Sequence, residues 1–186
     1  LARWDRAGLT VPRVSVNFCA EELRSPQLAD RIKWALDRFN LNPERLTIEI
    51  LETVITRTDD DVIVRNIAAL SALGCGIDLD DFGKGPASLT SIRRFKLRRL
   101  KIDRSFITRI NEDPDQQRVC SAILLMAGRL GLETIAEGVE TSGEQAVLAQ
   151  LGCAYIQGFG IGRPMPYEDT ADWITRHRAR LAGIPR

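Results

Sequence analysis

The sequence is poor in the residues on which many enzymes depend. Its one histidine, His177, lies in the basic segment RHRAR near the end of the chain. A solvated helix face is the simplest interpretation of that segment, so we expect neither a serine–histidine–aspartate triad nor a histidine-rich metal site. Any catalysis must therefore use carboxylates, amides and lysines.

The four cysteines are few and are spaced too far apart to form a CxxC pair. This spacing excludes a zinc ribbon and a thioredoxin-type redox site. Three of the four lie in or beside apolar strand-like runs, which predicts buried free thiols and a reducing compartment, the cytoplasm. The cysteines are Cys19, Cys75, Cys120 and Cys153.

The chain also lacks long apolar runs and any excess of one charge. No run approaches the ~18 residues of a membrane span, and the opening LARWDRAGLT has no signal-peptide core. The formal net charge is +1, which gives no reason to expect binding to polymeric nucleic acid. Neither GxGxxG after a first strand nor a Walker motif occurs, so the usual nucleotide-binding loops are absent.

What the sequence does contain is a regular alternation of strand-like and helix-like segments. Strands are predicted at 13–18, 46–50, 76–80, 98–102, 133–137 and 154–159. Helices are predicted at 25–39, 59–74, 86–95, 113–131, 142–152 and 167–180, with Ser25 as N-cap and Pro26 as the first helical residue of the first. This pattern is typical of an α/β protein with a parallel sheet.

Two architectures fit this alternation. A (β/α)8 barrel needs eight strands and typically roughly 250 residues, whereas this chain has 186 residues and six predicted strands. Residues 1–8 resemble the last turns of a helix that stops at Gly8. We therefore favour a single TIM-like barrel domain over 1–186 whose N-terminal strands lie upstream. The alternative is an open doubly wound sheet.

Each predicted strand carries a polar or ionisable residue near its carboxyl end. In a barrel these ends meet at one mouth, where barrel enzymes keep their active sites. A solvated face would not place polar residues at matching positions on six otherwise apolar strands. The residues are Asn17, Glu49, Asp80, Lys101, Glu137 and Gln157.

The third strand ends in two adjacent aspartates, Asp80 and Asp81, whose charges repel each other. On a regular strand the two side chains would face opposite sides, so the strand must turn here, and Gly83 and Gly85 permit a turn. Hard oxygen ligands without Cys or His suit Mg²⁺ or Mn²⁺. Two such ions could neutralise the pair and activate a shared water, with Lys101 stabilising charge on a phosphate.

The motifs at these positions resemble those of the EAL-domain cyclic-di-GMP phosphodiesterases. The resemblance covers essentially the whole chain, and its specificity comes from the motifs together. They are SVNF, EILE, DLDDFGKG, LKIDRSF, AEGVE and QGFGIGRPMP.

The resemblance implies a modified (β/α)8 barrel with an antiparallel first strand. It implies hydrolysis of cyclic di-GMP to linear pGpG with Mg²⁺ or Mn²⁺, and with Ca²⁺ as an inhibitory substitute. It further implies upstream regulatory or cyclase-like domains and assembly as a homodimer.

The resemblance also implies roles for individual residues. Asn17, Glu49 and Asp80 correspond to ligands of a first metal ion, and Asp80 and Asp81 to ligands of a second. Glu52 corresponds to the glutamate that braces the aspartate loop. Lys101 and Glu137 correspond to the pair that positions and deprotonates the attacking water, and Gln157 to a residue that helps to hold that water.

The chain departs from the family pattern in two places. The glutamate of the EAL signature, a metal ligand, and the arginine after it would lie upstream of Leu1, so we expect an N-terminally truncated domain. The loop usually reads DDFGTGYSS, whereas here Lys84, Pro86 and Ala87 replace threonine, tyrosine and serine. These changes bear on regulation more than on chemistry.

Two other functions remain open at this point. A degenerate EAL domain would bind cyclic di-GMP or a partner protein without turnover. A different Mg²⁺-dependent barrel enzyme would act on a sugar phosphate or enolate, with QGFGIG as a faint phosphate-loop candidate.

Overall fold

A computed structural model describes residues 1–56, 61–85 and 89–182. The strands in these residues are β1 (Val14–Phe18), β2 (Leu46–Leu51), β3 (Gly76–Phe82), β4 (Arg99–Ile102), β5 (Glu133–Ala136) and β6 (Tyr155–Ile156). The α-helices are α1 (Ala2–Arg6), α2 (Ala20–Leu23), α3 (Leu28–Arg38), α4 (Glu52–Thr56), α5 (Asp61–Leu73), α6 (Leu89–Arg94), α7 (Pro114–Arg129), α8 (Ser142–Gln150) and α9 (Tyr167–Ala182). Short 3-10 helices cover Pro43–Arg45 and Arg104–Phe106. None of the described helices combines the length and apolar character needed to cross a bilayer.

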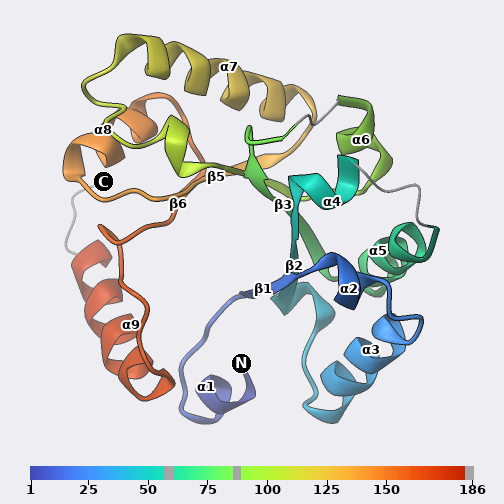
Figure 1. Ribbon diagram of the computed structural model, residues 1–186. Helices are drawn as coiled ribbons and strands as arrows, with labels where there is room; N and C mark the ends of the chain where they lie inside the picture. Colours follow the sequence, from blue (N-terminus) through green and yellow to red (C-terminus); the bar gives the residue numbers. More distant parts are fainter. Residues whose placement is uncertain (57–60, 86–88, 183–186) are drawn as a thin grey trace.

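The six strands form one parallel sheet in the order β1-β2-β3-β4-β5-β6. A doubly wound sheet would reverse its strand order at a switch point, and this order contains no reversal. Figure 1 shows the strands as an arc with α3, α5, α6 and α7 on its outer side. The prediction of an α/β fold of the TIM-barrel type is confirmed, in the form of a half-barrel with six parallel strands.

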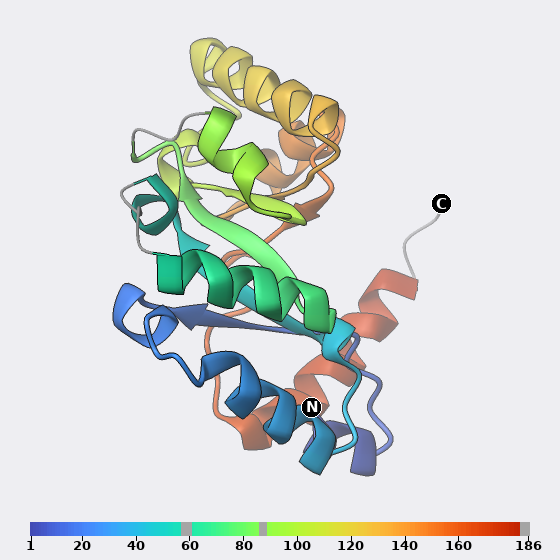
Figure 2. The same cartoon turned by 90° about the vertical axis from the view of Figure 1, so that its right-hand side faces the viewer.

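The first and last helices, α1 and α9, lie at the open side of the arc (Figure 1), and Figure 2 shows them from the side. The indole N–H of Trp4 donates to the hydroxyl of Thr170 at 2.8 Å, and its ring packs 5.6 Å from that of Tyr167. The helical interpretation of residues 1–8 is confirmed, since α1 is followed by Gly8 with φ of +72°. These contacts thus join α1 to α9.

The first long helix begins later than the sequence predicts. Gln27 is the N-cap and Leu28 the first helical residue, so the assignment of Ser25 and Pro26 to these positions was wrong. The amide of Asn66 binds the carbonyl oxygens of Leu23 and Ser25 at 2.7 and 2.8 Å. This bond from the neighbouring helix holds Ser25 in a turn, a tertiary effect that the local sequence does not encode.

The last strand is much shorter than the predicted 154–159, because only Tyr155 and Ile156 pair with β5. Beyond them the chain turns closely around Val139. A Cβ atom at Gly158 would lie 2.2 Å from the Val139 carbonyl oxygen, so only glycine fits. Gln157 is therefore carried by the loop after the strand and not by the strand itself.

The sheet separates an apolar outer layer from a polar inner layer. Ile48, Ile50, Leu79, Leu100 and Ile102 are fully buried in the two hydrophobic clusters of the molecule. Since neighbouring strand residues face opposite sides, the residues between them face the inside of the arc. These inner residues include Glu49, Asp78, Asp80 and Lys101.

Glu144, in the first turn of α8, fixes the loop that follows β5. Its carboxylate accepts backbone N–H bonds from Arg109 (2.9 Å), Glu140 (2.8 Å) and Thr141 (3.0 Å). Burial acts to raise the pKa of Glu144, but these donors outweigh it and hold the pKa below its usual range. The ionised carboxylate therefore stabilises the fold.

We expect E144Q to lower the free energy of unfolding at pH 7 by about 1–3 kcal/mol. Because the pKa of Glu144 is lowered in the folded state, its contribution is complete above the unfolded value and is lost as the pH falls through the folded value. The difference from wild type should thus shrink below about pH 4. Urea unfolding at several pH values measures this. The exposed neighbour variant E112Q should show no such difference.

Candidate functional site

Lys101 lies at the centre of three carboxylates at the carboxyl ends of the strands. Its Nζ is 2.8 Å from Glu49 Oε2, 2.9 Å from Asp80 Oδ1 and 2.8 Å from Glu137 Oε1. The lysine side chain is 3% exposed and the carboxylates 8–17%. Four residues from β2, β3, β4 and the end of β5 thus meet at one point, as expected for a barrel mouth.

The ion pairs shape the pKa values within this cluster. Burial acts to lower the pKa of Lys101, but the bonds to Glu137, Glu49 and Asp80 outweigh it and raise the pKa above its usual range. For Glu137, burial outweighs the attraction of Lys101 and raises the pKa. Lys101 is therefore a permanent cation at neutral pH.

A β-bulge brings the paired aspartates to the same mouth. Leu79 pairs with Leu100 and Phe82 pairs with Ile102, so Asp80 and Asp81 together lie opposite the single residue Lys101. Asp81 has φ of +56°, in the left-handed region. The extra residue changes the direction of the strand at Asp80 and Asp81, where the sequence predicted a turn. The strand itself does not end at Asp80, as predicted, but continues to Phe82.

Asn17 and Gln157 lie at the edges of the cluster. With its nitrogen facing the carboxylates, the Asn17 amide donates to Glu49 Oε2 and Asp80 Oδ2, both at 3.2 Å. If the Asn17 amide is rotated by half a turn, its oxygen instead of its nitrogen faces Glu49 and Asp80. Gln157 is exposed and lines a cavity together with Glu137.

Glu52, the first residue of α4, reaches across to the loop that follows the aspartates. Its Oε2 accepts the backbone N–H of Gly83 at 2.8 Å and that of Gly85 at 3.2 Å. A Cβ atom at Gly83 would lie 2.3 Å from the Phe106 ring, and Gly83 has φ of +105°. The loop is thus fixed on both sides of Lys84.

We expect E52A to release this loop, because two backbone donors lose their buried acceptor. Hydrogen–deuterium exchange at Gly83 and Gly85 should accelerate, and the free energy of unfolding should fall by about 1–3 kcal/mol. E52Q keeps an acceptor oxygen and should show the smaller change of the two. Equal exchange in wild type and E52A would contradict the bracing role.

The cluster has the composition of a cation site. Oxygens of Asp80, Asp81 and Glu137 lie within 4.8 Å of one another. Glu49, Asp80, Asp81 and Glu137 bring four negative charges when ionised and Lys101 one positive charge, which leaves three in excess. An all-oxygen donor set with excess negative charge fits Mg²⁺ or Mn²⁺.

The sequence analysis missed one ionic contact beside this cluster. Lys84 Nζ lies 3.0 Å from Asp81 Oδ1 and 2.8 Å from Asp103 Oδ2. Burial acts to raise the pKa of Asp103, but Lys84 and the N–H of Ser105 outweigh it and lower the pKa. The only signal in the sequence was the position of Asp103, two residues after Lys101 in LKIDRSF.

A cavity of about 1120 Å³ opens beside the cluster and provides room for a substrate. Its lining includes Asp81, Lys84, Arg104, Glu137 and Phe159. Cations, carboxylates and an aromatic ring in one cavity suit a ligand that carries phosphates and bases.

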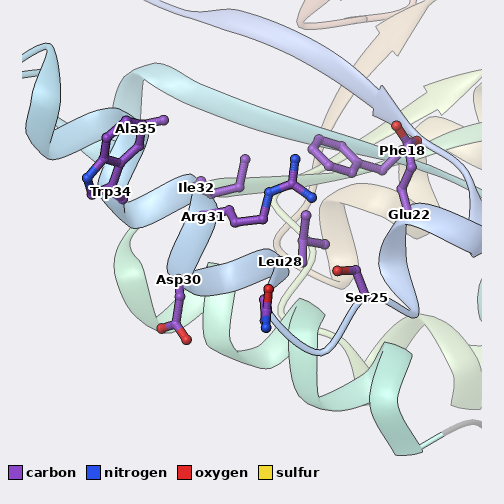
Figure 3. A pocket seen from close by; sticks show the side chains of 10 residues that line it. Phe18, Glu22, Ser25, Leu28, Asp30, Arg31, Ile32, Trp34 and Ala35 are labelled. Carbon is purple, nitrogen blue, oxygen red and sulfur yellow. The ribbon is translucent and has the colours of Figure 1, made fainter.

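A smaller cavity of about 830 Å³ lies on α3, away from this mouth. Figure 3 shows Ile32 and Leu28 near Phe18, with Asp30 pointing away from them. Because its acidic side chains do not converge, we place the candidate site at the mouth of the half-barrel.

Known proteins resemble this chain over most of its length. The family model described as "EAL domain" matches residues 1–164. The bifunctional diguanylate cyclase/cyclic di-GMP phosphodiesterase MucR of Pseudomonas aeruginosa is 40% identical over 165 residues, which are 89% of this chain and 24% of MucR. The chain spans 20–24% of the length of the first curated relatives that it matches.

Solved structures show the same fold. The MucR phosphodiesterase in complex with c-di-GMP has a TM-score of 0.82 at 39% identity, over 91% of this chain and 68% of that one. The EAL domain of Mycobacterium smegmatis DcpA has a TM-score of 0.86 at 26% identity, over 95% and 79%. Klebsiella pneumoniae BlrP1 with calcium and cyclic di-GMP has a TM-score of 0.77 at 26% identity, over 88% and 41%. With most of its length matched by the family model and by these structures, the chain belongs to the EAL domain family.

Proposed function

We propose that this domain hydrolyses cyclic di-GMP to linear pGpG in a reaction that depends on Mg²⁺ or Mn²⁺. The observation that carries the proposal is the convergence of Glu49, Asp80 and Glu137 on Lys101 beside an open cavity. The names of several relatives support it, since MucR, NbdA and RocR are each called cyclic di-GMP phosphodiesterases.

The proposed metal ligands are all oxygen donors at the mouth. Asn17, Glu49 and Asp80 would hold one ion, and Asp80 and Asp81 a second. The proximity of Glu137 to both aspartates makes it a further candidate ligand. When bound, such ions supply charge neutralisation at the scissile phosphate and acidify water.

The remaining residues act on the water and the phosphate. In the proposed reaction a water oxygen bonds to phosphorus, one phosphodiester P–O bond breaks, and the leaving ribose oxygen takes a proton. Glu137 accepts the proton of the water, Lys101 orients that water and stabilises charge on the phosphoryl oxygens, and Gln157 holds the water from the loop side. Glu52 keeps the aspartate loop in place.

The proposal is tested by incubating the purified full-length protein with cyclic di-GMP and Mn²⁺ and separating the nucleotides by chromatography, because the signature glutamate expected upstream of Leu1 is itself a metal ligand. We expect pGpG to accumulate, and excess EDTA to stop its formation. Binding of cyclic di-GMP without any product would instead support a domain that binds the nucleotide without turnover. Absence of both binding and product would reject both functions.

The domain is also proposed to work inside a longer signalling protein. The first curated relatives are four to five times as long as the matched region, and MucR is named as bifunctional with a diguanylate cyclase. Regulatory or cyclase-like domains in the same polypeptide, and a homodimer, are therefore the proposed partners of this domain, which we place in the cytoplasm.

A further inference from the structure

The loop after β3 carries a cation of its own, directly on one of the proposed metal ligands. The Lys84 ammonium lies 3.0 Å from Asp81 Oδ1, in the carboxylate group that also contains Asp80 and Glu137. A lysine here departs from the family loop, in which threonine is usual at this position.

Three contacts fix Lys84 in this position. Glu52 binds the backbone N–H groups of Gly83 and Gly85, the residues on either side of the lysine. Asp103 forms the second ion pair, at 2.8 Å, and its own side chain is only 3% exposed. The lysine is thus held between a buried carboxylate and the candidate metal ligand Asp81.

A positive charge within 3 Å of Asp81 opposes the approach of a second positive charge. For Asp81 to serve a divalent ion with both oxygens free, the Lys84–Asp81 pair must open. Asp103 offers Lys84 a place to remain when it does, because that ion pair does not involve Asp81.

We propose that Lys84 is an intrinsic competitor of the divalent ion at Asp81, and that Asp103 limits this competition by sharing the lysine. The inference rests on the proposed function, since it assumes a metal at Asp81. Lys84 acts through Asp81 and does not touch the reacting atoms. It sets how much Mg²⁺ or Mn²⁺ the domain needs before the second position fills.

The test is to measure Mn²⁺ binding to the purified protein without nucleotide, using the electron paramagnetic resonance signal of free Mn²⁺ to determine how much is bound. K84M is expected to bind the weaker of the bound ions roughly twofold to fivefold more tightly than wild type. K84R keeps the charge and should keep the wild-type affinity. D103N should change the affinity in the opposite direction to K84M, because the lysine then pairs with Asp81 alone.

The matched control is K96M, which removes the same charge from an exposed lysine before β4, at the far end of the strand from Asp103. It should leave Mn²⁺ binding unchanged. Equal affinity in K84M and wild type would overturn the inference while leaving the proposed function intact. No Mn²⁺ binding by wild type would overturn both.

Discussion

K101M is expected to lower kcat for cyclic di-GMP hydrolysis by about 10²- to 10³-fold, the usual effect of removing one charged group that stabilises a transition state. Carboxylate oxygens of Glu49, Asp80 and Glu137 all lie within 2.9 Å of the Lys101 ammonium. Methionine keeps much of the volume of the lysine side chain but cannot neutralise these charges. Steady-state assays with saturating Mn²⁺ measure the change.

The same variant should be less stable without metal. Removing one partner of a buried ion pair costs about 3–5 kcal/mol, and here three carboxylates lose their shared cation. A divalent ion can take over part of this neutralisation, so Mn²⁺ should raise the melting temperature of K101M by more than that of wild type. K96M is the control and should match wild type in both respects. A K101M protein as stable as wild type without metal would contradict the central position of the lysine.

D80N is expected to act on the metal and not on the stability of the metal-free protein. Asp80 belongs both to the lysine cluster and to the carboxylate group that suits a cation. Losing it should weaken Mn²⁺ binding by on the order of 100-fold and kcat by at least a similar factor. Isothermal titration with Mn²⁺ and product assays measure the two effects.

Without metal, D80N should unfold within about 1 kcal/mol of wild type, because Lys101 keeps Glu49 and Glu137 while one repelling charge is removed. The exposed helix variant D37N is the matched control and should retain metal binding and activity. If D80N bound Mn²⁺ as tightly as wild type, Asp80 would not be a metal ligand. A large loss of metal-free stability in K101M and little or none in D80N would distinguish the role of the cation of the cluster from that of its anions.

Much of the sheet could be predicted from the sequence because the first four strands alternate apolar and polar residues with a period of two. That period by itself assigns Glu49, Asp80 and Lys101 to the face opposite the apolar residues of their strands. The helix from Asp113 was equally visible, since Asp113 accepts N–H bonds from Asp115 and Gln116 and is followed by a proline.

Features set by contacts between distant segments could not be predicted in the same way. The late start of α3 depends on Asn66, some forty residues further along the chain. The short β6 depends on the close approach of Gly158 to Val139. Helix α4 was not predicted, because no element was assigned between the strand at 46–50 and the helix at 59–74, although Glu52 in fact begins a helix.

In the candidate site, too, local features could be predicted and contacts between distant segments could not. The polar residues at the strand ends were identifiable one by one, but their partners were not. The ion pair between Lys84 and Asp103 joins the loop after β3 to the end of β4, and no local pattern couples these two positions.

Segments 57–60 and 86–88 lie outside the described residues, and so do the loop substitutions Pro86 and Ala87 and the predicted starts of two helices.

The bulge at Asp80 and Asp81 has a consequence for how such a domain can change over evolutionary time. Strand β3 has one more residue than β4 between their paired positions, so that Asp80 and Asp81 both lie opposite Lys101 at the mouth. Deleting either aspartate would restore a regular ladder and remove one carboxylate in a single step, whereas a substitution leaves the extra residue and the register in place. We therefore expect an alignment of active relatives to show fewer gaps at this point of the chain than replacements among the residues around it.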